Sequence, residues 1–169
     1  MTQLNVSFGH PQYSDDALRE SITDLLDRHQ TLAMATVMED RSYINTLHYA
    51  YSSALDLFTV TSPFAQHSRN AETNPSVAVA VWNEPKVWGA DLQGAQMFGI
   101  WQPVQPAGMA VAMDALTSHI PGFGEAFSHP EDREGSGPKL YVISVLQVKL
   151  LDESRFGREN HLSLTVFGK

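Results

Sequence analysis

Two stretches of the chain have the hydrophobic spacing of an amphipathic helix. In the first, apolar residues at i, i+4, i+7 and i+8 follow a serine and two aspartates, which suit a helix N-terminus. We expect this helix to begin near Asp15 and to end near His29. A second helix is expected over residues 107–119, and its spacing predicts that it buries Met109, Met113, Leu116 and Ile120.

The other apolar stretches are rich in β-branched and aromatic residues, which favour strands. Residues 31–38 are apolar throughout, so we expect this strand to be buried on both faces. Gly94 and Gly99 interrupt a long strand and predict bulges or bends. Residues 63–74 interrupt the strand pattern and predict a short helix, with Pro63 in its first position. The strands are expected over residues 31–38, 43–51, 55–61, 76–82, 91–104 and 139–151, with a short one near 161–167.

Most of these strands are joined by short connections, which favours antiparallel pairing over βαβ units. The sequence therefore predicts an α+β protein, mainly β, in which about six antiparallel strands form a closed barrel with helices outside it. A length of 169 residues is typical of one domain, with a core expected over about residues 15–158.

Composition excludes several classes of protein. With no cysteine, the chain cannot form a disulfide framework, an iron–sulfur cluster or a thiol active site. A net charge of −8 argues against a broad nucleic-acid-binding face, and no apolar run is long enough to cross a membrane. The first residues lack the features of a secretory signal, so we expect a cytoplasmic protein.

Residues 61–75 are the strongest candidate for a ligand site. Thr61 and Ser62 end a predicted strand, and the helix that follows brings Gln66, His67 and Arg69 into its first turns. A helix N-terminus with hydroxyl groups and a basic side chain beside it suits a phosphate group. On local sequence alone, a simple helix cap with solvated basic side chains is the more common explanation of the same pattern.

The region around this candidate site carries few charges. Between residues 42 and 71 the only formal charges belong to Asp56 and Arg69, although the chain as a whole is acidic. The strand over residues 43–49 alternates aromatic and polar side chains, which suits a flat heterocycle that makes apolar contacts with its faces and hydrogen bonds at its edge. The alternative is a strand that exposes its polar side to water.

Thr61, His67 six positions later and Asn74-Pro75 before a valine-rich strand resemble the flavin-phosphate segment of the pyridoxamine 5′-phosphate oxidase-like, FMN-binding split-barrel superfamily. The order of the other elements agrees over residues 15–158. The chain departs from the family pattern in having His67 where Lys or Arg is usual and Ala65 where Ser is usual.

The resemblance implies a homodimer that binds FMN at the subunit interface. The residues it implies as cofactor-binding are Thr61, Ser62, Gln66 and His67 for the phosphate, Asn45, Thr46 and Leu47 for the ring, and Gln96 near the ring or the partner subunit. It also implies a flavin-dependent oxidoreductase that acts on an unidentified small molecule.

Three other functions remain open at this stage. The same fold could carry flavin without catalysis, could bind haem through His129 or His161, or could bind deazaflavin, for whose acidic tail few basic residues are present. The histidines show no metal-ligand spacing, so we expect no metal site built by the protein itself.

Overall fold

The computed structural model describes residues 2–127 and 137–168. The helices are α1 (Asp15–Arg28), α2 (Gln66–Thr73), α3 (Met109–His119), α4 (Phe123–Ala126) and α5 (Glu153–Phe156), with one 3-10 turn over Pro106–Gly108. The strands are β1 (Thr31–Met38), β2 (Arg41–Tyr51), β3 (Asp56–Thr61), β4 (Ser76–Trp82), β5 (Gln93–Pro103), β6 (Lys139–Asp152) and β7 (His161–Thr165). Among the described residues, no helix is long and apolar enough to span a membrane.

The strands form one antiparallel sheet that closes on itself. Their order is β3-β2-β1-β4-β5-β6-β7, and a further pairing of β3 with β6 closes the first six strands into a barrel. The predicted α+β, mainly β, six-stranded antiparallel barrel with flanking helices is therefore confirmed, and β7 adds an extra strand at its edge.

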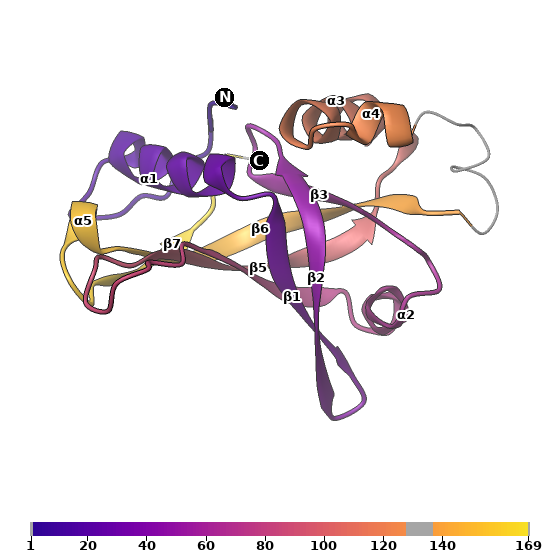
Figure 1. Cartoon of the computed structure of the whole chain (residues 1–169), viewed down its shortest axis with the longest axis horizontal. Helices are drawn as coiled ribbons and strands as arrows, with labels where there is room; N and C mark the ends of the chain where they lie inside the picture. The colour runs from indigo at the N-terminus through magenta and orange to yellow at the C-terminus, as the bar shows by residue number, and fades with distance from the viewer. Residues whose placement is uncertain (1, 128–136, 169) are drawn as a thin grey trace.

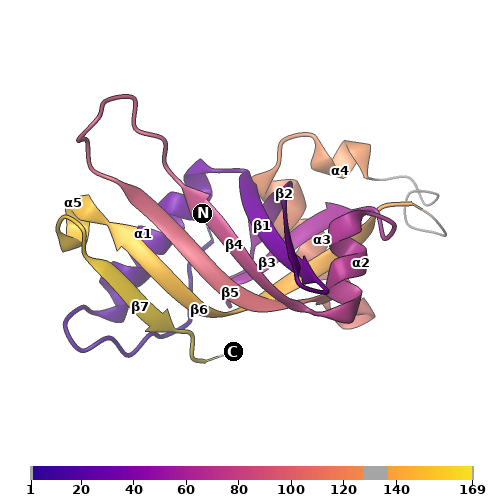
Figure 2. The same ribbon diagram turned by 90° about the horizontal axis from the view of Figure 1, so that it is seen from below.

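The helices lie on selected sides of the barrel. Figure 1 shows α1 and α3 along one side, with α2 at the opposite end of β1 and β2. In Figure 2 the strands β4, β5 and β6 run side by side across the front of the molecule, with α2 at one end and α1 behind them. Within the described residues, no helix covers the middle of this outer face of the sheet.

The core explains why these segments fold as they do. The α1 stripe buries Leu18, Ile22, Leu25 and Leu26 against the barrel, and the Ser14 hydroxyl accepts a hydrogen bond from the Ala17 amide as the N-cap. The core also takes in residues outside the expected limits of 15–158, namely Leu4, Val6, Phe8, Leu162 and Leu164.

Three local expectations were wrong. Strand β1 buries alternate residues, with Val37 exposed, because no element of the described chain covers its outer face. Helix α2 begins at Gln66, so Pro63 lies in the preceding turn. Helix α3 buries Leu116 and leaves Met109 exposed, because its buried side is centred on Ala112.

One predicted bulge is confirmed. The register between β5 and β6 shifts between Phe98 and Gly99. A Cβ atom at Gly99 would lie 2.5 Å from the Ser144 carbonyl oxygen, which is closer than any side chain can approach. Glycine therefore allows the two backbones to come together at the bulge.

Candidate functional site

The β3–α2 junction brings two of the predicted phosphate-binding residues into contact. Thr61 is the last residue of β3, and its Oγ1 atom lies 2.9 Å from Nε2 of His67 in the first turn of α2. Ser62 continues the same turn, where its Oγ accepts a hydrogen bond from the Phe64 amide and its carbonyl accepts one from the Ser68 hydroxyl. The junction is therefore a tight, polar turn that holds Thr61 and His67 side by side.

The N-terminus of α2 has no side chain to cap it. Its N-cap residue is Ala65, which has no hydroxyl or carboxylate and makes no side-chain capping bond. The backbone N–H groups of a first helical turn lack partners within the helix and carry a partial positive charge. An anion at this end of α2 would supply the acceptor that Ala65 cannot.

His67 lies in a partly buried setting. Burial lowers the pKa of His67 below its ordinary value of 6.5, so the imidazole is neutral at pH 7 in the free protein. Its ring also meets the buried indole of Trp101 edge-on, with the two centroids 6.3 Å apart. The imidazole is thus held in place by one hydrogen bond and one ring contact.

Gln66 belongs to a second hydrogen-bond chain. Its Nε2 donates to Oδ1 of Asn70 over 2.7 Å, and Nδ2 of Asn70 donates to Oγ1 of the buried Thr36 over 3.0 Å. This chain anchors α2 to β1. Gln66 is itself exposed, so its amide lies at the surface of the junction.

The predicted ring-binding residues of β2 lie on opposite faces of the strand. Leu47 is buried and Asn45 half-buried on the inner face, whereas Thr46 is exposed on the outer face, as the two-residue period of a strand requires. Both side-chain polar atoms of Asn45 are buried and have no hydrogen-bond partner among the described residues. A buried amide without partners is costly, so Asn45 offers a donor and an acceptor to a ligand.

Gln96 lies far along the same outer face as Thr46. The cross-strand pairs Thr46–Ala33, Ala33–Ala80 and Ala80–Gln96 form one row across β2, β1, β4 and β5. At about 4.8 Å per strand, the row separates Thr46 from Gln96 by roughly 14 Å. One chain therefore distributes the predicted residues over three places: the β3–α2 junction, the inner face of β2 and the outer face of the sheet.

The structure adds a residue that the sequence analysis missed. Lys139 is the cross-strand partner of Thr61 in the pairing that closes the barrel. Directly paired residues of antiparallel strands point to the same face, so Lys139 brings an ammonium group to the Thr61 side of the sheet. It makes no ion pair among the residues that the structure describes. No local motif could have revealed it, because β3 and β6 meet only on closure of the barrel.

The uncovered outer face carries an apolar patch with a flat centre. At that centre β1 and β4 place only alanines, and the register pairs Ala35 with Ala78 and Ala33 with Ala80. Larger apolar residues surround this alanine centre and are exposed to solvent in the single chain. They are Val37, Ile44, Trp82, Phe98 and Ile100.

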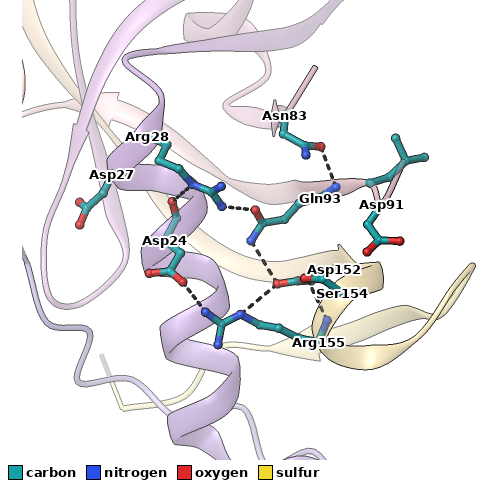
Figure 3. A pocket seen from close by; sticks show the side chains of 10 residues that line it. Asp24, Asp27, Arg28, Asn83, Asp91, Gln93, Asp152, Ser154 and Arg155 are labelled. Atoms are coloured by element: carbon teal, nitrogen blue, oxygen red, sulfur yellow. Dashed lines mark hydrogen bonds and ion pairs between the residues drawn. The ribbon is translucent and has the colours of Figure 1, made fainter. Parts of the chain in front are cut away.

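A cavity of about 500 Å³ lies at the other end of the molecule, between α1, β5 and α5 (Figure 3). Its centre is the buried Asp152, whose Oδ2 accepts hydrogen bonds from Ser21 over 2.6 Å and from Gln93 over 3.1 Å. Arg155 lies 3.3 Å from the same oxygen and also pairs with Asp24. These groups satisfy one another, so the cavity is best explained as a polar crosslink that holds α1 to the barrel.

Comparison with known proteins supports the fold. No protein-family model and no curated protein matches this sequence. A haem-binding protein from Mycobacterium smegmatis aligns with a TM-score of 0.70 at 18% identity, over 88% of this chain and 57% of that one. The present chain therefore spans a little over half of the mycobacterial protein.

Two further solved structures are similar over most of their own length. An FAD-binding protein from Mesorhizobium loti aligns with a TM-score of 0.60 at 18% identity, over 79% of this chain and 91% of that one. A protein from Listeria innocua described provisionally as a pyridoxamine 5′-phosphate oxidase aligns with a TM-score of 0.60 at 13% identity, over 79% of this chain and 98% of that one. The resemblance predicted from the sequence is thus confirmed at the level of the split-barrel fold.

Of the residues named for the haem alternative, only His161 can be placed. It is the first residue of β7 and is exposed. His129 lies outside the described residues. No group of three or more metal-binding side chains is found in the part of the chain that the structure describes.

Proposed function

We propose that this protein binds FMN non-covalently and acts as a flavin-dependent oxidoreductase on a small molecule. The observation that carries the proposal is the β3–α2 junction, where Thr61 and His67 adjoin a helix N-terminus that has no side-chain cap. A phosphate monoester matches such a site in charge and in hydrogen-bond acceptors. The fold supports the same conclusion, since an FAD-binding protein and a pyridoxamine 5′-phosphate oxidase-like protein share it.

Each predicted residue has a role in this proposal. Thr61, Ser62, Gln66 and His67 would hold the phosphate, with Lys139 adding the positive charge that His67 lacks at neutral pH. The unpartnered amide of Asn45 would meet the polar edge of the ring system, beside Leu47. An amide suits this task because a flavin edge presents both donors and acceptors.

The flavin, when bound, supplies the redox chemistry, by accepting and passing on a hydride or electrons. The protein's own residues bind the flavin and orient it. Thr61 and His67 would hold the phosphate end of the flavin, and Asn45 would hold the ring end by hydrogen bonding. The proposal assigns no side chain as an acid or a base, because hydride transfer to a flavin does not require one.

We further propose that two chains assemble through the uncovered outer face. Thr46 and Gln96 both lie on this face, so a partner chain packed against it would bring them into a shared site. The flat alanine centre allows close approach, and the exposed apolar side chains of Val37, Ile44 and Phe98 would be buried. Assembly would thus complete a cofactor site that one chain holds only in parts.

Haem is the second candidate, since the mycobacterial structural neighbour is a haem-binding protein. His161 is the described residue that would serve as an axial ligand. The buried donor and acceptor of Asn45 favour FMN, because the edge of a haem macrocycle, apart from its propionates, offers no hydrogen-bonding groups to an amide.

Absorbance spectroscopy of the purified protein distinguishes these candidates. We expect flavin bands, or binding of added FMN at micromolar concentration, and bleaching of bound FMN by NADH or NADPH. A Soret band without flavin would favour haem instead. Binding without bleaching by either nucleotide would indicate a flavin carrier, and no binding of FMN would refute the proposal.

A further inference from the structure

A second, smaller hollow lies between the ends of β4, β5 and β6 and the start of β7, away from the β3–α2 junction. Its volume is about 290 Å³, close to the lower limit of ordinary ligand pockets and large enough for one or two fused rings. Figure 2 shows these four strands side by side on the uncovered side of the barrel. The residues that line it include Trp82, Gly94, Gln96, Lys149, Leu151 and His161.

The floor of the hollow suits a flat aromatic group. Trp82 and Leu151 are the cross-strand partners of Gly94 on its two sides, so glycine lies between an indole and a leucine. A Cβ at Gly94 would lie 3.3 Å from Cβ of Trp82, which is tighter than most real contacts. The missing side chain therefore leaves a flat apolar strip beside the half-exposed indole, on which an aromatic ring can stack.

The rim of the hollow carries the ammonium group of Lys149 and the imidazole of His161. Lys149 pairs in register with Gln96 on one side, and His161 pairs with Leu151 on the other. Neither Lys149 nor His161 has an ion pair among the described residues. The nearby carboxylate of Glu153 is occupied by the amides of Leu92 and Glu159, at 2.9 and 3.1 Å. Glu153 nevertheless interacts electrostatically with His161. Lys149 is therefore the basic side chain on the rim of this apolar hollow that has no ion pair among the described residues.

We propose that this hollow binds a planar aromatic carboxylate, with its ring on the Trp82–Gly94–Leu151 strip and its carboxylate between Lys149 and His161. The carboxylate would form charge-assisted hydrogen bonds with these two side chains. Gln96 lines the hollow and also belongs to the proposed cofactor site, so the ligand would lie beside the flavin. Its identification as the substrate rests on the proposed flavin function, whereas its binding does not.

The test uses 2-naphthoate and its neutral analogue 2-naphthamide, titrated calorimetrically into the FMN-free protein at pH 7. We expect the carboxylate to bind about tenfold more tightly than the amide, the size of effect that one charge-assisted hydrogen bond provides. In the Lys149→Met variant this preference should vanish while amide binding is unchanged. The matched Lys86→Met variant removes an exposed lysine that does not line the hollow, so it should keep the preference.

Two further variants separate this site from the alternatives. A Gly94→Leu substitution should weaken binding of both compounds, because it fills the strip, and a circular dichroism spectrum verifies that the barrel is retained. Loss of carboxylate binding in Lys139→Met would place the anion at the β3–α2 junction and overturn the proposal, as would equal affinity for the two compounds.

Repeating the titration with FMN at saturation tests the neighbouring position. Undiminished naphthoate binding supports a separate site beside the flavin. Competition between naphthoate and FMN would overturn the proposal of a separate site. If FMN itself does not bind, the proposed function fails, but the results with Lys149→Met and 2-naphthamide still decide the present proposal.

Discussion

Thr61 and His67 are joined by a hydrogen bond of 2.9 Å that connects the end of β3 to the first turn of α2. The bond holds the imidazole beside the end of β3, and burial lowers its pKa and so favours its neutral form. A neutral imidazole can take up a proton when a phosphate binds beside it. The pair therefore fixes the position of His67 and still allows the imidazole to become positively charged toward an anionic ligand.

Removing this pair should weaken FMN binding. We expect the double variant Thr61→Ala/His67→Ala to lose at least about 1.5 kcal/mol of binding free energy, the scale of a hydrogen bond to a charged group. Flavin fluorescence quenching measures the affinity. The control His10→Ala removes a histidine near the N-terminus whose ring accepts a bond from the Gln12 amide, and it should bind FMN as the parent does. An unchanged affinity in the double variant would show that the phosphate binds elsewhere.

His67 should also affect the stability of the FMN-free protein. Because burial lowers its folded-state pKa, the unfolded chain takes up a proton near pH 6.5 while the folded protein still resists protonation. The contribution of neutral His67 to the free energy of unfolding is complete above pH 6.5 and is lost as the pH falls toward the lowered pKa. We expect the free energy of unfolding, measured with urea, to decline less steeply between pH 7 and 5.5 in His67→Gln than in the parent. Parallel slopes would contradict the assignment.

Lys139 should contribute to phosphate binding through its position opposite Thr61. We expect Lys139→Gln to weaken FMN binding by roughly fivefold to tenfold, and the loss should shrink at high salt because exposed charges are screened. Riboflavin, which has no phosphate, should bind the variant and the parent equally. Lys86→Gln is the matched control, since Lys86 is an exposed lysine in the β4–β5 connection. Equal losses for riboflavin and FMN would assign Lys139 a structural role.

The sequence predicted the elements well because their signals are local. The Ser14 cap and the leucine spacing of α1 define a helix without reference to the rest of the chain. The start of α2 was misplaced because Ser62-Pro63 is a good capping pair by sequence, whereas in the structure these residues form a turn and the helix begins after Ala65, which makes no capping bond. The burial of β1 was overestimated because alanines on an uncovered face have the same apolar pattern as alanines in a core.

The candidate site was less predictable because it depends on contacts between distant segments. Adjacent residues of a strand alternate between faces, so grouping Asn45 with Thr46 joined two surfaces of the barrel. Lys139 becomes relevant only through the β3–β6 pairing. The buried, unpartnered amide of Asn45 depends on the side chains that the folded chain packs around it, and no sequence pattern records that.

The β5–β6 bulge should tolerate no side chain at Gly99. A Cβ there would lie 2.5 Å from a backbone oxygen and 2.9 Å from Cγ2 of Ile143, so the strands would have to separate. We expect Gly99→Ala to lower the free energy of unfolding by about 1–3 kcal/mol. Gly108→Ala is the control, because its Cβ would meet only Cγ1 of Val104 at an ordinary 3.5 Å. Equal stability of the two variants in urea would show that the bulge adapts.

The uncovered face should determine the oligomeric state. Ala78 lies at the centre of this face, between its cross-strand partners Ala35 and Phe98. A charged side chain there would have to be desolvated without a partner if a second chain covers it, which costs several kcal/mol. We expect the parent to have twice the chain mass of 18.7 kDa by light scattering and Ala78→Arg to be monomeric. The control Ala110→Arg adds the same charge to the exposed side of α3 and should remain dimeric.

The same pair of variants tests whether the cofactor site needs both chains. If Thr46 and Gln96 complete the site across the interface, Ala78→Arg should lose FMN affinity although the β3–α2 junction is untouched. Ala110→Arg should bind FMN as the parent does. A monomeric parent would contradict the proposed assembly. A monomeric Ala78→Arg with full FMN affinity would instead show that one chain holds the cofactor, and that Asn45 and the Thr61–His67 pair suffice for binding.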